Sequence, residues 1–228
     1  MCYSVGVYVG AGSRQDTIET SGTANALNMM ITRGTSARSK VDFAQEIEQM
    51  GARSNASTDR EWATQSVTCM KGDVSKAVNI LGDIYSSANL DGAEFEACKQ
   101  ELSAEHENNH KQLQPHTIEL AHFNSYRDHM IGQPIKGDRD NVQNLTVEGL
   151  NGYRAANYFG DNMVIVGTGG IDHESFVDQC NQAFGAMQKT PTLASTDEKC
   201  VFTPSLLFVR DDEMYNSNVA VFYDAPSV

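Results

Sequence analysis

Apolar residues recur along the chain with two spacings, and these spacings predict where strands and helices lie. In VGVYV (5–9) they alternate with smaller residues, which is typical of a β-strand. In KVDFAQEIEQMG (40–51) they lie four and three residues apart, which is typical of a helix. The same patterns predict two strands around a turn near Asp59, a buried strand at 163–168, late strands at 205–210 and 218–225, and further helices over 20–33, 74–85, 91–115, 147–160 and 173–187.

Helix boundaries are marked by a few polar residues and one proline. Asp73, Asp91 and Asp172 each stand directly before a helical pattern, where a short carboxylate accepts a free backbone N–H. Pro115 is expected to break the long helix that begins after Asp91. Strands and helices mix without strict alternation, and a hairpin lies in the middle. The sequence therefore predicts an α+β fold with helices packed on one face of a mostly antiparallel sheet.

Composition narrows the classes of function. The 228 residues are 40% hydrophobic, without the run of about eighteen apolar residues that a membrane-spanning helix needs. A net charge of −13 argues against a nucleic-acid partner and suits either basic ligands or a solvated acidic surface. The five cysteines are spread out and form no C-x-x-C pair, which indicates reduced thiols in a cytosolic or matrix-like compartment. No ligand set for a haem, flavin or iron–sulfur cluster is visible, so no cofactor is expected.

The stretch HENNH (106–110) matches H-E-x-x-H, a zinc-protease motif. Two histidines four residues apart on a helix can chelate one Zn²⁺, and the glutamate between them, here Glu107, can take a proton from metal-bound water. One interpretation is therefore an active zinc site at His106 and His110. The other is a polar, solvated helix segment, which is favoured because so short a motif arises by chance.

Several blocks together resemble a known family, the inverted-motif, pitrilysin-like zinc peptidases. They include VGVYVGAGSRQD (5–16), the Gly34–Thr35 pair, MGARSNASTDRE (50–61) and MVIVGTGGIDHESF (163–176). The branch it is most similar to contains the mitochondrial processing peptidase subunits and the core proteins of the cytochrome bc complex. The resemblance implies two similar lobes. Residues 1–205 would be the first lobe, lacking its first strand, and residues 206–228 a linker and the opening strand of a mostly absent second lobe.

The resemblance also places the family's H-x-x-E-H motif on this chain. The two ligand histidines fall on Asn25 and Met29, and the general-base glutamate falls on Asn28. The third ligand, a glutamate, falls on Glu105 and is kept. Asparagine and thioether groups are poor zinc ligands, and an amide cannot accept a proton as a carboxylate does. The sequence therefore predicts no metal site at these vestigial positions and no enzymatic activity.

Residues Asn55, Ala56, Ser57 and Thr58 match the edge strand that faces the substrate in active members. Here this segment is either a relic or a strand that still pairs with a peptide or a neighbouring subunit.

Three functions follow as hypotheses. The first is a non-catalytic structural core subunit of the cytochrome bc complex (respiratory complex III), peripheral on the matrix side of the mitochondrial inner membrane. Its partners would be a second core or processing-peptidase-like subunit and other respiratory subunits, without nucleic acid or a membrane span of its own. The alternative is a non-catalytic subunit of a mitochondrial processing peptidase that binds basic presequence peptides. The third is an active zinc protease through His106, Glu107 and His110.

Overall fold

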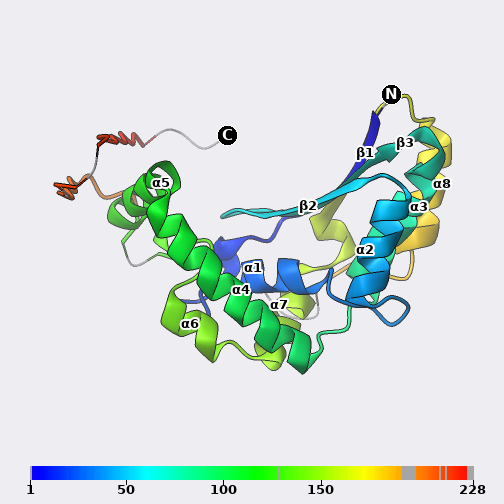
Figure 1. Ribbon diagram of the computed structural model, residues 1–228, viewed down its shortest axis with the longest axis horizontal. Coiled ribbons are helices and arrows are strands. Elements are labelled where there is room, and N and C mark those ends of the chain that lie inside the picture. The colour runs from blue at the N-terminus through cyan, green and yellow to red at the C-terminus, as the bar shows by residue number, and fades with distance from the viewer. Residues whose placement is uncertain (1, 128, 192–198, 211, 214, 225–228) are drawn as a thin grey trace.

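Four antiparallel strands form the sheet on which the other elements pack in the computed structural model. They are β1 (Cys2–Val9), β2 (Arg53–Thr58), β3 (Ala63–Met70) and β4 (Met163–Thr168), in the order β2-β3-β1-β4 (Figure 1). The structure describes residues 2–127, 129–191, 199–210, 212–213 and 215–224, apart from the side chains of 106–111. Strands β2 and β4 are the two edges of this sheet.

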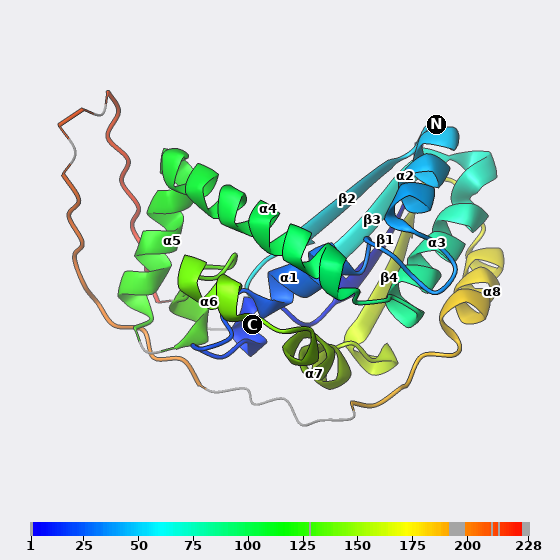
Figure 2. The same cartoon turned by 60° about the horizontal axis from the view of Figure 1, so that its bottom comes forward.

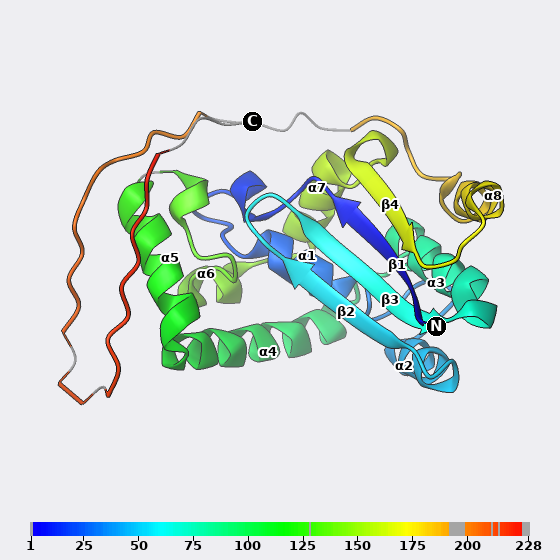
Figure 3. The same ribbon diagram turned by 90° about the horizontal axis from the view of Figure 1, so that it is seen from above.

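Helices lie on one side of the sheet. The α-helices are α1 (Thr23–Met30), α2 (Lys40–Gln49), α3 (Val74–Ser86), α4 (Gly92–Lys111), α5 (Leu113–Ser125), α6 (Arg139–Asn144), α7 (Val147–Asn157) and α8 (His173–Phe184). Short 3₁₀ turns occupy η1 (Ser13–Gln15), η2 (Lys71–Asp73), η3 (Met130–Gly132) and η4 (Gly160–Asn162). Seen from above the sheet, no helix lies in front of the strands (Figure 3). The predicted α+β fold is confirmed.

The core forms where the inward face of the sheet meets α1 and α3. Val5, Val7 and Val9 are fully buried on this face of β1, because every second residue of a strand points to the same side. Leu27 of α1 and Leu81 of α3 are among the largest buried side chains packed against them. Helix α4 in turn packs across α1, away from the sheet (Figure 2). Helix α1 is thus enclosed between the sheet and α4.

The prediction of a buried strand at 163–168 is wrong. Residues of β4 do form a strand, but Val164 is 52% exposed. Strand β4 pairs only with β1, and its outward side chains lie on the face that no described helix covers. A continuous run of apolar residues indicated burial on both faces, whereas only one face of this edge strand is packed.

Two of the three predicted caps are confirmed. The Asp91 carboxylate accepts hydrogen bonds from the backbone N–H groups of Ala93 and Glu94, and the Asp172 carboxylate accepts one from Ser175. Asp73 makes no such bond, because its carboxylate pairs with Lys76 at 2.9 Å.

Pro115 does not break the long helix. Helix α4 ends at Lys111, and α5 begins at Leu113 after a single extended residue, Gln112. Pro115 lies in the first turn of α5, where a backbone N–H has no partner within the helix and its loss costs little. Among the described residues, no helix is long and apolar enough to cross a membrane.

The predicted late strands are absent from the described residues of 199–224. This segment runs alongside α5 without regular structure, held by a hydrogen bond from the Thr203 N–H to the Ser125 carbonyl (2.8 Å). The Phe222 ring also packs edge-on against His122, with 4.8 Å between ring centres. No neighbouring strand supplies a hydrogen-bonded ladder, so apolar alternation alone does not produce a strand. The lobe boundary at 205/206 stays a prediction.

Apolar side chains on this segment are unusually exposed, with Leu206 at 93% and Phe208 at 81%. Such surface promotes association with other chains unless a partner covers it. We expect Leu206→Ser combined with Phe208→Ser to reduce self-association of the purified chain, measured by analytical ultracentrifugation. The double variant Asn181→Ser with Gln182→Ser, at two exposed polar positions of α8, is the control. If both variants self-associate equally, this segment is not the surface through which the chains associate.

Candidate functional site

Helix α1 is fixed at its N-terminus by a carboxylate that precedes it in the chain. Asp16 is buried, and its two oxygens accept hydrogen bonds from the backbone N–H groups of Gly22 (2.9 Å) and Ala24 (3.0 Å). Burial raises the pKa of Asp16 to about 8, against the opposing effect of these backbone hydrogen bonds. Asp16 thus caps α1 although it lies six residues before Gly22, the residue that precedes the helix. Local capping patterns do not predict so distant a cap.

A buried amide clamp, formed by Asn28 and Gln65, holds α1 against the β2–β3 hairpin. The Asn28 side-chain NH₂ donates to the Ser57 carbonyl (2.9 Å) and to the Thr58 hydroxyl (3.0 Å). The Gln65 NH₂ donates to the Asn28 backbone carbonyl (2.7 Å) and side-chain oxygen (3.0 Å). Both residues are at most 3% exposed. Every one of these contacts joins α1 to a hairpin strand, so the clamp sets the position of the helix on the sheet.

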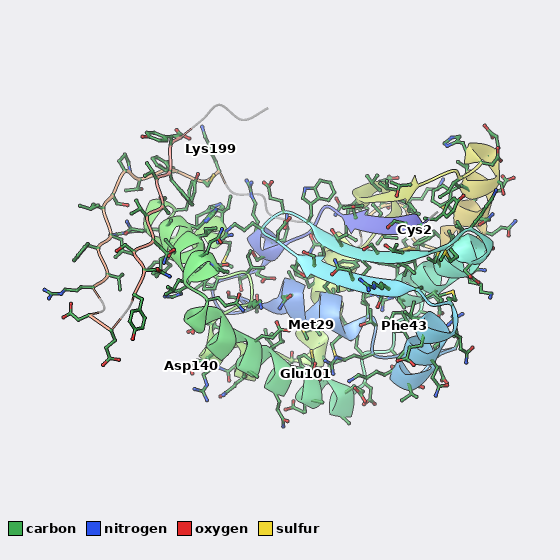
Figure 4. All side chains as sticks on the ribbon, turned by 45° about the horizontal axis from the view of Figure 1, so that its top comes forward. Cys2, Met29, Phe43, Glu101, Asp140 and Lys199 are labelled. Atoms are coloured by element: carbon green, nitrogen blue, oxygen red, sulfur yellow. The ribbon has the colours of Figure 1, made fainter. Side chains whose placement is uncertain are left out.

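A pocket of about 650 Å³ opens between α1, α4 and β2. Asn25, Asn28 and Met29 line it from α1, and Glu105 lines it from α4. Figure 4 shows Met29 on α1 between β2 and the part of α4 that carries Glu101. The structure therefore brings together all four positions that the resemblance assigned to the motif. Asn25 differs from Asn28 in that its side-chain nitrogen is buried without a hydrogen-bond partner.

Three carboxylates line the pocket, and each is paired with a cation. Glu101 contacts the Arg33 guanidinium, Glu119 lies 2.9 Å from Arg60, and Glu105 lies 3.1 Å from the Lys136 ammonium. None of these pairs was foreseen from the sequence, because the partners are separated by about thirty residues or more and ion pairing leaves no local pattern.

Cys98, on the same helix as Glu105, is fully buried. Burial raises the pKa of its thiol to about 11, so the thiol stays protonated and unreactive at neutral pH. This side chain is a packing residue beneath the pocket.

The pocket is bordered by the edge strand predicted to face a peptide. Ala56, Ser57 and Thr58 line it, whereas Asn55 of the same strand is exposed outside it. Among the residues that the structure describes, β2 pairs only with β3, so its other edge lies unpaired at the pocket. An unpaired edge beside a pocket is the arrangement that accepts an added strand.

The sequence profile of the family described as Insulinase (Peptidase family M16) matches residues 2–139, and that of the Peptidase M16 inactive domain matches residues 144–228. The chain belongs to peptidase family M16. This confirms the resemblance drawn from the motif blocks. Mitochondrial-processing peptidase subunit beta of Neurospora crassa is 33% identical over 98% of this chain, and that of Homo sapiens is 32% identical over 97%. The chain spans about half the length of these relatives, 48% and 46% respectively.

Two solved structures share the fold. A protease from Helicobacter pylori superposes with a TM-score of 0.80 over 89% of this chain and 49% of its own, at 20% identity. A peptidase M16 inactive domain from Pseudomonas fluorescens gives 0.76 over 86% of this chain and 48% of its own, also at 20% identity. At these identities the likeness supports the α+β architecture alone.

The expectation that the chain is not an enzyme is wrong. Its M16 relatives are named as subunits of a peptidase, and the profile over its first 138 residues is that of a peptidase family. That expectation rested on three side chains of one pocket. The match to a peptidase family extends over residues 2–139, and the chain spans about half the length of its relatives.

The zinc ion implied by the resemblance does not fit the residues of this pocket. The Asn28 amide is already engaged in the clamp, Met29 offers a thioether, and Glu105 is ion-paired with Lys136. Over the part of the chain that the structure describes, no three His, Cys, Asp or Glu side chains are placed to hold a metal. The side chains of His106, Glu107 and His110 lie outside the described residues, so a zinc site there stays untested. The absence of a metal site also stays a prediction.

The clamp predicts unequal effects for two asparagines on one helix. We expect Asn28→Ala to lower the free energy of unfolding by about 1–3 kcal/mol, because the Ser57 carbonyl and the Thr58 hydroxyl lose their donor and the Gln65 amide loses one of its two acceptors. Asn28→Asp should cost more, because a buried carboxylate would face the Ser57 carbonyl oxygen. Asn25→Ala is the control, since its side-chain nitrogen has no partner to lose. Urea unfolding monitored by circular dichroism measures all three, and equal midpoints for Asn25→Ala and Asn28→Ala would refute the clamp.

Proposed function

We propose that this chain is a processing-peptidase subunit of the mitochondrial matrix and that its pocket holds an extended stretch of polypeptide substrate. The observation that carries the proposal is the unpaired edge of β2 beside the pocket. A peptide laid along this edge would gain backbone hydrogen bonds from β2 and place alternate side chains toward α1 and α4.

Two buried donors in the pocket wall support a peptide as ligand. The Asn25 side-chain nitrogen and the Arg33 Nη1 are both buried without a hydrogen-bond acceptor, although Nη1 lies 3.7 Å from the Glu94 carboxylate. Buried polar groups are normally satisfied, and an orphan donor lowers stability. The carbonyl oxygens of an extended peptide are acceptors of the kind that these two groups lack.

Charge supports a basic peptide. The chain carries a net charge of −13, so its surface as a whole is acidic, although Arg33, Lys40 and Lys136 line the pocket together with Glu101, Glu105 and Glu119. A basic peptide would be drawn toward such a surface by long-range attraction. These features fit the presequence-binding role that was the alternative hypothesis.

The partner we propose is a second processing-peptidase-like subunit. The relatives are named as one subunit, beta, of a processing peptidase, which supports an assembly of more than one chain. The same names favour this role over that of a structural core subunit of the cytochrome bc complex at the inner membrane.

Binding of a short synthetic peptide tests the proposal. We expect an arginine-containing peptide to bind the chain with a measurable Kd by fluorescence anisotropy. The same peptide with alternate backbone nitrogens methylated on one edge should bind about tenfold more weakly or not at all, because each methyl removes a donor and blocks strand addition. Methylation of the opposite edge is the matched control. Equal weakening by both patterns would contradict strand addition, and no binding of the unmodified peptide would contradict the proposed function.

A further inference from the structure

The counter-ions of the three pocket carboxylates differ in how firmly they are held. The Arg33 side chain is 6% exposed and contacts both Glu101 and, at 3.7 Å, Glu94. The Arg60 side chain is 13% exposed and donates to the Ile131 carbonyl (2.7 Å) as well as to Glu119. These two arginines are built into the protein, so a ligand would not readily displace them, although Glu101 also lies 3.9 Å from the exposed Lys40 ammonium.

The pair formed by Glu105 and Lys136 is of another kind. Both side chains are more than one-third exposed, at 44% and 37%, and a single 3.1 Å contact joins them. Exposed pairs of this type are weak, because water screens the attraction and the lysine stem loses rotational freedom. An arginine side chain is a stronger partner for a carboxylate, since its planar guanidinium can bond both oxygens at once. A ligand carrying arginine could therefore displace the Lys136 ammonium from Glu105.

The backbone of Lys136 is nevertheless held in a fixed place beside the pocket. It lies in a turn closed by a hydrogen bond from the Gly137 N–H to the Pro134 carbonyl (3.0 Å). Gly137 and Gly22 both have left-handed backbone conformations, with φ of +77° and +98°. A Cβ at Gly137 would approach the Gly22 Cα to 2.8 Å, so the turn rests directly on the residues before α1. The lysine is thus anchored at its base, whereas its side chain is 37% exposed.

We propose that Lys136 is an exchangeable internal counter-ion and that an arginine side chain of the bound peptide takes its place on Glu105. The inference rests on the proposed function and names the two residues that would set its selectivity. Lys136 occupies Glu105 when no ligand is bound, and only a side chain that pairs better with this carboxylate displaces it. Selectivity for arginine would then come from the difference between two cations on one carboxylate.

Two peptides that differ at one side chain test this exchange. The first carries one arginine, and the second carries citrulline, an uncharged isostere, in its place. Binding of both is measured on the full chain by fluorescence anisotropy. We expect Lys136→Ala to lower the Kd of the arginine peptide about two- to fivefold, because no lysine then competes for Glu105. The Kd of the citrulline peptide should not change. Glu105→Gln should weaken the arginine peptide about tenfold and abolish the preference for arginine.

Controls separate the exchange from general charge effects. Lys76→Ala removes the same charge from an exposed pair with Asp73 on α3, outside the pocket, and should change neither affinity. In the double variant Lys136→Ala with Glu105→Gln, removing the lysine should no longer lower the Kd of the arginine peptide. Circular dichroism confirms that each variant is folded.

The outcomes distinguish this inference from the proposed function. If both peptides bind but Lys136→Ala leaves their ratio of Kd values unchanged or lowers the preference for arginine, the exchange is wrong and peptide binding stands. If neither peptide binds the unaltered chain or Lys136→Ala, the proposed function fails, and the exchange fails with it.

Discussion

The structure depends on the hydrogen bonds between Gln65 of β3 and Asn28 of α1, which lie in an otherwise apolar layer. Gln65 lies on the inward face of β3, next to buried Val67, and would be costly there without partners. Asn28 of α1 accepts a hydrogen bond from Gln65. Its own side-chain NH₂ donates to the carbonyl of Ser57 and to the hydroxyl of Thr58. Because a buried amide is satisfied in few positions, this clamp allows α1 one placement against the hairpin. Asp16 fixes the other end of the helix from outside it.

The placement of α1 determines the chemistry of the pocket. The hydrogen bonds of the Asn28 side chain hold α1 in place. The groups that face the pocket are therefore the Asn25 amide, the Met29 thioether and the ion pairs formed by residues of α4 and α5. These groups can bind an extended, basic chain through hydrogen bonds and charge, along an edge strand that the clamp keeps in register. The chain belongs to peptidase family M16, and the described residues of its pocket include no zinc ligand set. The peptide binding proposed above is compatible with both findings.

The sequence predicted well those features that repeat locally. Alternation at Val5, Val7 and Val9 and the cap at Asp172 each depend on neighbouring residues, and both are present in the structure. Predictions failed where the answer lay elsewhere in the chain. Exposure of Val164 depends on which helices cover the sheet, and the late strands needed a pairing partner. In the site, the resemblance to a known family pointed to Asn25, Asn28, Met29 and Glu105. Their partners Gln65 and Lys136 come from distant segments, and no pattern near either residue marks it as a partner.

Hydrogen exchange with and without a bound arginine-containing peptide tests the central claim most directly. The two edge strands of one sheet serve as experiment and control: β2 borders the pocket, and β4 lies at the opposite edge. The account predicts that peptide binding slows amide exchange in residues 53–58 and leaves exchange in residues 163–168 unchanged, because only β2 would gain a hydrogen-bonded neighbour. Protection at β4, or equal exchange at β2 when the peptide is demonstrably bound, would contradict it.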